Sequence, residues 1–141
     1  MISVVHIDDD EQFLALARHW ILHQNPQTSV ASFSSPAEAL SYLLQGKDCD
    51  VIISDLQMPA LDGLMVRNFL RLVDSKVPFI LLTGSELVSR KGLPPDLLVV
   101  SKSSEVRRMF DILSSVLDQI QNNMRPEWVC HSAECSLLCS F

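Results

Sequence analysis

Acidic, hydroxyl and ammonium side chains follow short apolar runs at separate places in this sequence of 141 residues. Asp8-Asp9-Asp10 follows the first run, Asp55 a second, Thr83 a third and Lys102 a fourth. Carboxylates that gather on one rim repel one another, so some must bind protons or a cation must lie among them. Mg²⁺ suits such a rim, because it prefers oxygen ligands and commonly binds one or two carboxylates together with a phosphate oxygen. With a hydroxyl and an ammonium opposite, the set suits phosphoryl transfer to an aspartate.

The elements that must position these groups are predicted from the apolar periodicity. Runs of strand length lie at residues 2–7, 51–53, 79–82 and 97–100, with a weaker run at 29–33. Between the strands, apolar residues recur every three or four positions, as one buried helix face requires. These helical sets are Phe13, Leu14, Ala17 and Ile21; Ala39, Leu40, Leu43 and Leu44; Val66, Phe69, Leu70 and Val73; and Val106, Phe110, Leu113, Leu117, Ile120 and Met124.

The predicted fold is a doubly wound α/β domain with a five-stranded parallel sheet, because strands that are apolar on both faces need helices on both sides. Ligands of such a sheet bind beyond the carboxyl ends of its strands, where the polar groups described above lie. Ser35-Pro36-Ala37-Glu38 predicts a helix start, with a capping serine and a proline in the first turn. Gly92, Pro94 and Pro95 limit a helix between the fourth and fifth strands to about two turns near residues 86–91.

The loop after the third predicted strand, Asp55-Leu56-Gln57-Met58-Pro59-Ala60-Leu61-Asp62-Gly63, resembles the D-x-x-M-P-x-x-D-G signature of response regulator receiver domains at every defined position. Asp8-Asp9, Thr83 and Lys102 are similar to the acidic pair, the switch hydroxyl and the lysine of that family, in the same chain order. The resemblance covers roughly residues 2–122. It implies a two-component response regulator of the single-domain, chemotaxis-regulator-like kind, with the flavodoxin-like strand order 2-1-3-4-5 and a shortened fourth helix.

The same resemblance implies the roles of the site residues. Asp55 accepts a phosphoryl group in a Mg²⁺-dependent reaction, and Thr83 and Lys102 bind the phosphoryl oxygens. Gln57 and Ser85 occupy positions that set the lifetime of the phosphoryl bond. The implied metal ligands are Asp9 directly, Asp8 through water, Asp55, and the backbone carbonyl of Gln57.

Three features of the sequence depart from the family pattern. Val99 stands three positions before Lys102, where the family usually has an aromatic residue that changes rotamer with the switch hydroxyl. Ser103 stands where a proline is usual, and the segment from Thr83 to Lys102 is short. We therefore expect the acceptor chemistry to be kept and the usual relay to be altered. We also expect a monomer or an atypical dimer, because the shortened helix changes the face on which many receiver domains dimerise.

Bulk composition bounds the class of protein. With 48% hydrophobic and 20% charged residues, the chain is expected to form one globular receiver domain over residues 1–123. Residues 124–141 form a C-terminal tail whose apolar side chains are expected to pack on the domain or on a partner. The net charge of -6 without a basic stripe argues against direct nucleic-acid binding. The lack of a membrane-length apolar run or a leader argues for a cytoplasmic protein without a membrane partner.

Several residues have plainer alternatives to a role in the site. Asp10 is expected to cap a helix, Asp62 to serve a loop turn, and His6 to be packed in its strand. His19 and His23 lie one helical turn apart and could bind a metal, although surface histidines are favoured. The three cysteines and one histidine of the tail could bind zinc, but they lack the C-x-x-C spacing, and no disulfide framework is expected.

Three functions are compatible with these features. The leading hypothesis is a signalling switch phosphorylated by a sensor histidine kinase or a histidine phosphotransfer protein and then recognised by an unknown downstream protein. A Mg²⁺-dependent phosphohydrolase with an aspartate nucleophile would typically need a second aspartate two residues later, where this chain has Gln57. We therefore expect no enzyme activity beyond self-catalysed phosphotransfer and autodephosphorylation. The third hypothesis is a phosphorylation-independent adaptor module, motivated by Val99, Ser103 and the shortened fourth helix.

Overall fold

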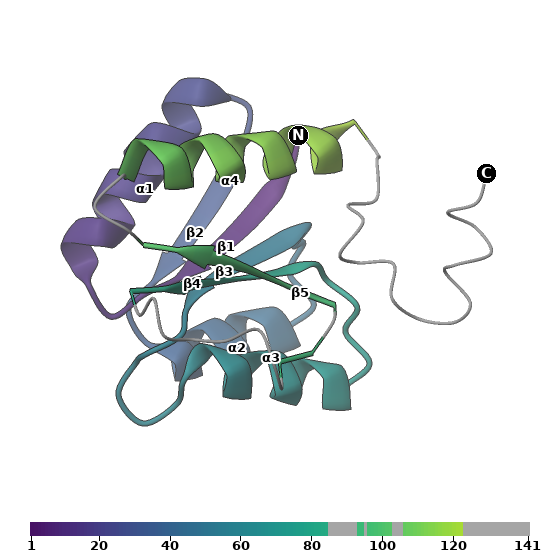
Figure 1. Cartoon of the computed structure of the whole chain (residues 1–141). Coiled ribbons are helices and arrows are strands. Elements are labelled where there is room, and N and C mark those ends of the chain that lie inside the picture. Colours follow the sequence, from purple (N-terminus) through teal and green to yellow (C-terminus); the bar gives the residue numbers. More distant parts are fainter. Residues whose placement is uncertain (85–92, 95, 103–105, 123–141) are drawn as a thin grey trace.

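The computed structural model describes residues 1–84, 93–94, 96–102 and 106–122 (Figure 1). Strands and helices alternate along them: β1 Ser3–Ile7, α1 Glu11–Gln24, β2 Ser29–Phe33, α2 Pro36–Leu44, β3 Val51–Asp55, α3 Gly63–Leu72, β4 Phe79–Thr83, β5 Leu97–Ser101 and α4 Val106–Gln121. Neighbouring strands pair in parallel in the order β2-β1-β3-β4-β5. This confirms the doubly wound α/β fold and the strand order expected from the sequence.

Helices cover both faces of the sheet (Figure 1). α1 and α4 lie on one face, where their apolar side chains form a core with Val4 of β1 and Ile53 of β3. α2 and α3 lie on the other face, over the alternate residues Val5 and Ile52. β3 and β4 are buried along their whole length, which explains why these runs are apolar without alternation.

Side chains cap the first three helices at their N-termini. Asp10 accepts hydrogen bonds from two backbone N–H groups in the first turn of α1, at 3.0 and 3.2 Å, as the sequence predicts. Ser35 caps α2 and is followed by a proline, also as predicted. Asp62 accepts a hydrogen bond from a backbone N–H of α3 at 2.8 Å, so it caps this helix rather than serving only a loop turn. These caps fix where each helix leaves the rim of the sheet.

Parts of the predicted helix faces are exposed, contrary to the sequence prediction. The exposed fractions of Phe69 and Val73 are 42% and 49%. α3 packs on the sheet along a narrow line formed by Gly63, Val66 and Leu70. Phe69 therefore lies beside the contact line, and Val73 follows the last residue of the helix. Leu44, the last residue of α2, and Val106, the first of α4, are also exposed because the ends of these helices are not covered by the sheet.

Some predictions concern parts of the chain that the structure does not describe. The short helix expected near residues 86–91, Ser85, Ser103 and the tail from residue 124 all lie outside the described residues. Within the described part of the chain, no helix has both the length and the apolar character that a membrane span requires.

Candidate functional site

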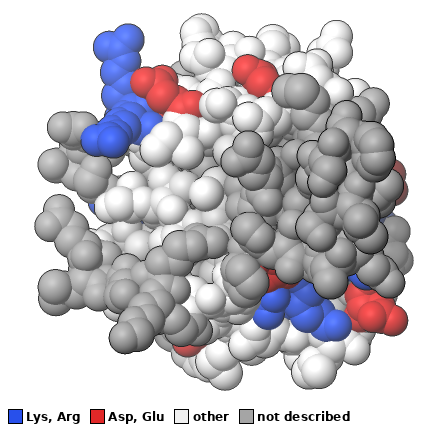
Figure 2. All heavy atoms as spheres, turned by 45° about the vertical axis from the view of Figure 1, so that its right-hand side comes forward, with Lys and Arg blue, Asp and Glu red and all other residues white. Residues whose placement is uncertain are grey.

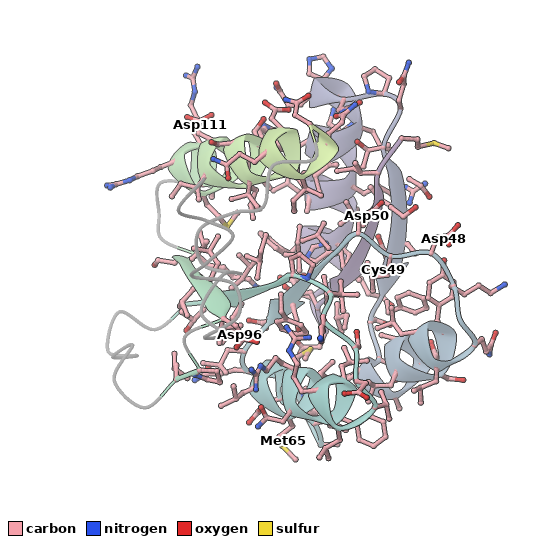
Figure 3. All side chains as sticks on the ribbon, turned by 90° about the vertical axis from the view of Figure 1, so that its right-hand side faces the viewer. Asp48, Cys49, Asp50, Met65, Asp96 and Asp111 are labelled. Carbon is pink, nitrogen blue, oxygen red and sulfur yellow. The ribbon has the colours of Figure 1, made fainter. Side chains whose placement is uncertain are left out.

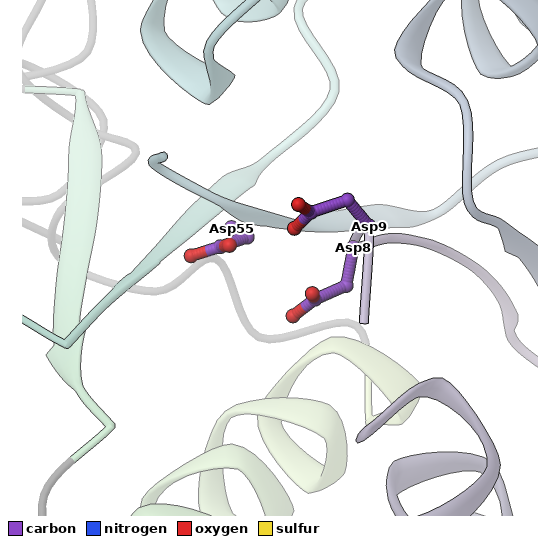
Figure 4. Close-up of side chains that lie close together, drawn as sticks. All are labelled: Asp8, Asp9 and Asp55. Carbon is purple, nitrogen blue, oxygen red and sulfur yellow. The ribbon is translucent and has the colours of Figure 1, made fainter. Parts of the chain in front are cut away.

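The carboxylates of Asp8, Asp9 and Asp55 lie together at the carboxyl ends of β1 and β3 (Figure 4). These strands are neighbours with Ile7 opposite Ser54, so the residues that follow in each strand are brought to the same rim. One carboxylate oxygen from each aspartate lies within 4.8 Å of the others. Within the described residues, this is the group of three or more potential metal-ligating side chains whose ligand atoms lie this close together.

The ammonium of Lys102 reaches this cluster from the end of β5. Its Nζ lies 2.5 Å from Oδ2 of Asp8 and 3.5 Å from Oδ1 of Asp55. The backbone N–H of Lys102 donates to the carbonyl of Thr83 at 2.8 Å, which extends the ladder between β4 and β5 by one residue. The side chain of Lys102 is only 20% exposed, so water screens its charge less than at an open surface.

The three carboxylates differ in exposure and in the charge that surrounds them. Asp8 is fully buried, Asp9 is exposed, and the side chain of Asp55 is 12% exposed. Burial raises the pKa of Asp55 above its usual range, Lys102 lowers it without cancelling that effect, and the charges of Asp8 and Asp9 raise it further. With all three carboxylates ionised, the cluster carries more negative charge than the Lys102 ammonium offsets. Its hard oxygen donors fit a divalent cation such as Mg²⁺.

Thr83 lies at the same rim as Asp55. It ends β4, and its exposed fraction is 3%. Asp55 is paired with Leu82, so Thr83 stands one residue further along the neighbouring strand. Gln57 is exposed in the loop after β3, where its backbone follows the acceptor candidate by two residues.

The loop between β3 and α3 packs very closely on the backbone of Asp55. The N–H of Leu56 donates to the carbonyl of Leu82 at 2.8 Å, and the N–H of Gly63 donates to the carbonyl of Leu56 at 3.0 Å. A Cβ atom on residue 63 would lie 2.3 Å from the backbone oxygen of Asp55 and 2.7 Å from Cδ1 of Leu81. Gly63, which ends the signature loop, is thus required for space, because α3 begins against the strand that carries Asp55.

Sequence reasoning missed the contact of Phe13 with this site. The ring centre of Phe13 lies 4.2 Å from Nζ of Lys102. The sequence signal available was its position in the first turn after the acidic triplet, which predicts a place near the rim but no contact. His6 is packed as expected, with an exposed fraction of 1%. Burial and the nearby charge of Lys102 lower the pKa of His6 to about 3, so it is neutral.

The alternative metal ligands do not gather in the described part of the chain. His19 and His23 are exposed on α1 with ring centres 6.4 Å apart, and within the described residues no third potential ligand joins them. The cysteines and histidine of the tail lie outside the described residues. Cys49 is a half-buried free thiol whose pKa is raised by burial to about 12, which leaves it as a poor nucleophile.

The fold and the site together define a class of protein: a doubly wound α/β domain with an acidic, lysine-bearing site at the carboxyl edge of its sheet. Comparison with known families then gives the identity of the domain. The model of the response regulator receiver domain matches residues 4–92. The chain therefore belongs to the receiver domain family of two-component response regulators, as the resemblance implies.

Curated relatives of the chain are longer response regulators. The cyclic di-GMP phosphodiesterase response regulator RpfG of Xanthomonas campestris is 32% identical over 96 residues, a match that covers 65% of this chain and 25% of RpfG. The heme response regulator HssR of Staphylococcus epidermidis is 29% identical over 126 residues, which is 87% of this chain and 54% of HssR. The chain thus spans about a quarter to a half of the length of these relatives.

Solved receiver structures share the fold. TrrA of Thermotoga maritima, solved in complex with Mg²⁺ and BeF, has a TM-score of 0.70 and 24% identity, over 85% of this chain and 99% of TrrA. The phosphorylated cyanobacterial phytochrome response regulator RcpA has a TM-score of 0.74 and 18% identity, over 88% of this chain and 96% of RcpA. At these identities the likeness establishes the fold alone.

Proposed function

We propose that this receiver domain accepts a phosphoryl group on Asp55 in a Mg²⁺-dependent reaction and signals by protein binding in the phosphorylated state. The observation that carries the proposal is the cluster at the carboxyl rim. Asp8, Asp9 and Asp55 offer carboxylate oxygens within 4.8 Å of one another, and the Lys102 ammonium lies 3.5 Å from Asp55. Asp55 is the carboxylate of this cluster that also begins the signature loop of residues 55–63.

Each residue of the cluster has a distinct task in this reaction. A carboxylate oxygen of Asp55 attacks the phosphorus of a phosphohistidine donor, and the P–N bond breaks as the P–O bond forms, so the imidazole leaves and takes up a proton. Lys102 and Thr83 bind the phosphoryl oxygens. Asp8, Asp9, Asp55 and the backbone carbonyl of Gln57 are the proposed Mg²⁺ ligands. A bound Mg²⁺ would supply positive charge that offsets the negative charge of the reacting carboxylate and phosphoryl group.

The position of Lys102 suggests what the ammonium does before the reaction. Its Nζ is nearer to the buried Asp8, at 2.5 Å, than to Asp55, at 3.5 Å. We infer that Lys102 serves first as the counter-ion of Asp8, since a buried carboxylate without positive charge nearby is costly. At 3.5 Å from Oδ1 of Asp55, the same ammonium is also within reach of phosphoryl oxygens bound to that residue.

Turnover on external substrates is not favoured by the residues present. The side chain two positions after Asp55 is the amide of Gln57, which cannot donate or accept a catalytic proton at neutral pH. We therefore propose that the chain is no enzyme beyond its own phosphorylation and dephosphorylation. The complete acidic cluster also disfavours a phosphorylation-independent adaptor, which would have no need of it.

The proposed partners are proteins. Upstream we propose a sensor histidine kinase or a histidine phosphotransfer protein in the cytoplasm, and downstream a protein that recognises the phosphorylated domain. On the face drawn in Figure 2, the basic side chains of the described residues lie in separate groups beside acidic ones, which favours protein partners over nucleic acid. We propose that residues 1–123 form the receiver unit and that residues 124–141 pack on it or on a partner.

Intact mass spectrometry tests the proposal. The purified protein is incubated with phosphoramidate with and without Mg²⁺, and a mass gain of one phosphoryl group is expected with Mg²⁺ only. Asp55→Asn should abolish the gain. Asp48→Asn is a matched control, because Asp48 is an exposed carboxylate in the loop before β3, at the opposite end of the strand (Figure 3). Equal labelling of Asp55→Asn and the wild type would refute the assignment.

A further inference from the structure

The ammonium of Lys102 is held by a ring as well as by carboxylates. Its Nζ lies 4.2 Å from the centre of the Phe13 ring and 2.5 Å from Oδ2 of Asp8. A cation within about 6 Å of a ring centre is attracted to the negative face of the aromatic system. Continuing the alternation of β5 by one residue places Lys102 on the face of Val100, which is the face covered by α1 and α4.

We propose that Phe13 is a positioning residue, whose ring holds the Lys102 ammonium where it can reach the phosphoryl group on Asp55. This inference rests on the proposed function and adds a residue to its site. The reason lies in the competition for the ammonium. Asp8 attracts it from one position and Asp55 from another. A fixed ring between the sheet and α1 limits the positions that the flexible lysine side chain can occupy.

The backbone ties Phe13 to the carboxylate that pairs with Lys102. Oδ1 of Asp8 accepts a hydrogen bond from the N–H of Asp10 at 2.9 Å. Oδ1 of Asp10 in turn accepts one from the N–H of Phe13 at 3.2 Å. One stretch of chain, residues 8–13, therefore sets both the Asp8 carboxylate and the ring, so their spacing around the ammonium is fixed together.

Neighbouring rings hold Phe13 from its other sides. His6 packs on it edge-to-face, with ring centres 5.7 Å apart and planes at 74°. Phe110 of α4 stacks on it at 6.4 Å with planes at 10°, and Trp20 stacks on Phe110 at 4.7 Å. A role in the core alone explains these contacts. It does not explain why a charged ammonium lies over the ring, and a leucine at this place would satisfy the core without attracting the ammonium.

The test compares Phe13→Leu, which keeps a large apolar side chain but removes the ring, with Phe13→Tyr, which keeps the ring. The first readout is the NMR shift of the Lys102 ε-methylene protons. The ring should move these resonances upfield relative to those of the exposed Lys47 and Lys76, and the effect should vanish in Phe13→Leu but stay in Phe13→Tyr. This readout needs no phosphorylation and does not respond to a loss of stability alone.

The second readout is the rate at which phosphoramidate labels Asp55 with Mg²⁺ present. Phe13→Leu should slow labelling by roughly three- to tenfold, and Phe13→Tyr should restore it to within about twofold of the wild type. In a Lys102→Ala background, Phe13→Leu should cause no further loss, because the ring acts through the lysine.

The outcomes separate this inference from the proposed function. The inference alone would be overturned if the wild type showed no ring-current shift of Lys102. It would also be overturned if the Phe13→Leu protein were labelled as fast as the wild type. An equal loss from Phe13→Leu with and without Lys102 would also overturn it, since the ring would then be merely structural. If the wild type is not labelled at Asp55, the proposed function is overturned instead, and Phe13 then has no phosphoryl site toward which to position Lys102.

Discussion

Replacing Gly63 by alanine should damage both the stability of the domain and the geometry of its site. Gly63 is buried at the start of α3, and its N–H donates to the carbonyl of Leu56 at 3.0 Å. The new Cβ would lie 2.3 Å from the backbone oxygen of Asp55, whereas ordinary contact begins at 3.4 Å. Either α3 or the end of β3 must therefore move by about 1 Å, and a close-packed interior resists such a movement.

The magnitude follows from the atoms that Gly63→Ala would meet. Overpacking of a core costs typically about 1–3 kcal/mol. We expect the upper end, about 3 kcal/mol, because the nearest atom belongs to the backbone and Leu81 crowds the same position at 2.7 Å. For a domain of this size, that corresponds to a melting temperature lower by about 10 °C. The displaced atom belongs to Asp55, so labelling by a phosphodonor should slow by about tenfold or more.

Thermal unfolding followed by circular dichroism measures the effect, with two other glycines as controls. An added Cβ at Gly84 meets no described atom within 4 Å, so Gly84→Ala should change the free energy of unfolding by less than about 0.5 kcal/mol. Gly46 also has open space, but its φ of +78° strains any other residue, so Gly46→Ala should cost about 1 kcal/mol. A Gly63→Ala protein that melts with the wild type would refute the packing argument.

Three further predictions concern charge. Asp96 precedes β5 and accepts a hydrogen bond from Nε of Arg71 in α3 at 3.1 Å (Figure 3). Burial of Asp96 opposes its ionisation, but Arg71 and Arg67 outweigh this effect and lower the pKa of Asp96. Urea unfolding should show Asp96→Asn less stable by about 1–2 kcal/mol at pH 7, with the difference lost as the pH falls through the lowered pKa. Asp55 has a raised pKa, so its ionised form destabilises the metal-free domain above that pKa. Asp55→Asn should therefore melt higher than the wild type at pH 7 without Mg²⁺, and equal or lower melting would contradict this. Lys102→Ala should bind Mg²⁺ more tightly in a titration, because the substitution removes a competing positive charge from Asp8. The same variant should be phosphorylated more slowly. Tighter Mg²⁺ binding without slower phosphorylation would show that Lys102 takes no part in the reaction.

The carboxyl rim could be predicted from the sequence because parallel strands impose it. Once β1, β3, β4 and β5 are assigned, a fixed strand direction brings Asp8, Asp55, Thr83 and Lys102 to one edge, whatever the details of packing. The caps Asp10 and Ser35 were equally predictable, since capping depends on local spacing alone.

The features that the sequence could not predict depend on how elements meet in space. Phe69 fits the helical period of α3, yet it is 42% exposed because the helix packs along a narrower line. Phe13 fits the apolar period of α1, as a core residue would, and its contact with Lys102 depends on how α1 is placed relative to the end of β5. The signature predicts a glycine at position 63, but the sequence does not give the reason. The structure does, because an added Cβ there would lie 2.3 Å from the backbone oxygen of Asp55.

The central claim, that Asp55 carries the phosphoryl group, is tested most directly by trapping the modified residue. The protein is labelled with phosphoramidate and Mg²⁺, treated with borohydride, digested and sequenced by tandem mass spectrometry. Borohydride reduces an aspartyl phosphate to homoserine, so the modified position is read from the fragment masses. We predict homoserine at position 55, only in samples that contained both the donor and Mg²⁺. Homoserine at Asp8 or Asp9, or a phosphoryl group retained on a serine, threonine or histidine with position 55 unchanged, would contradict the account.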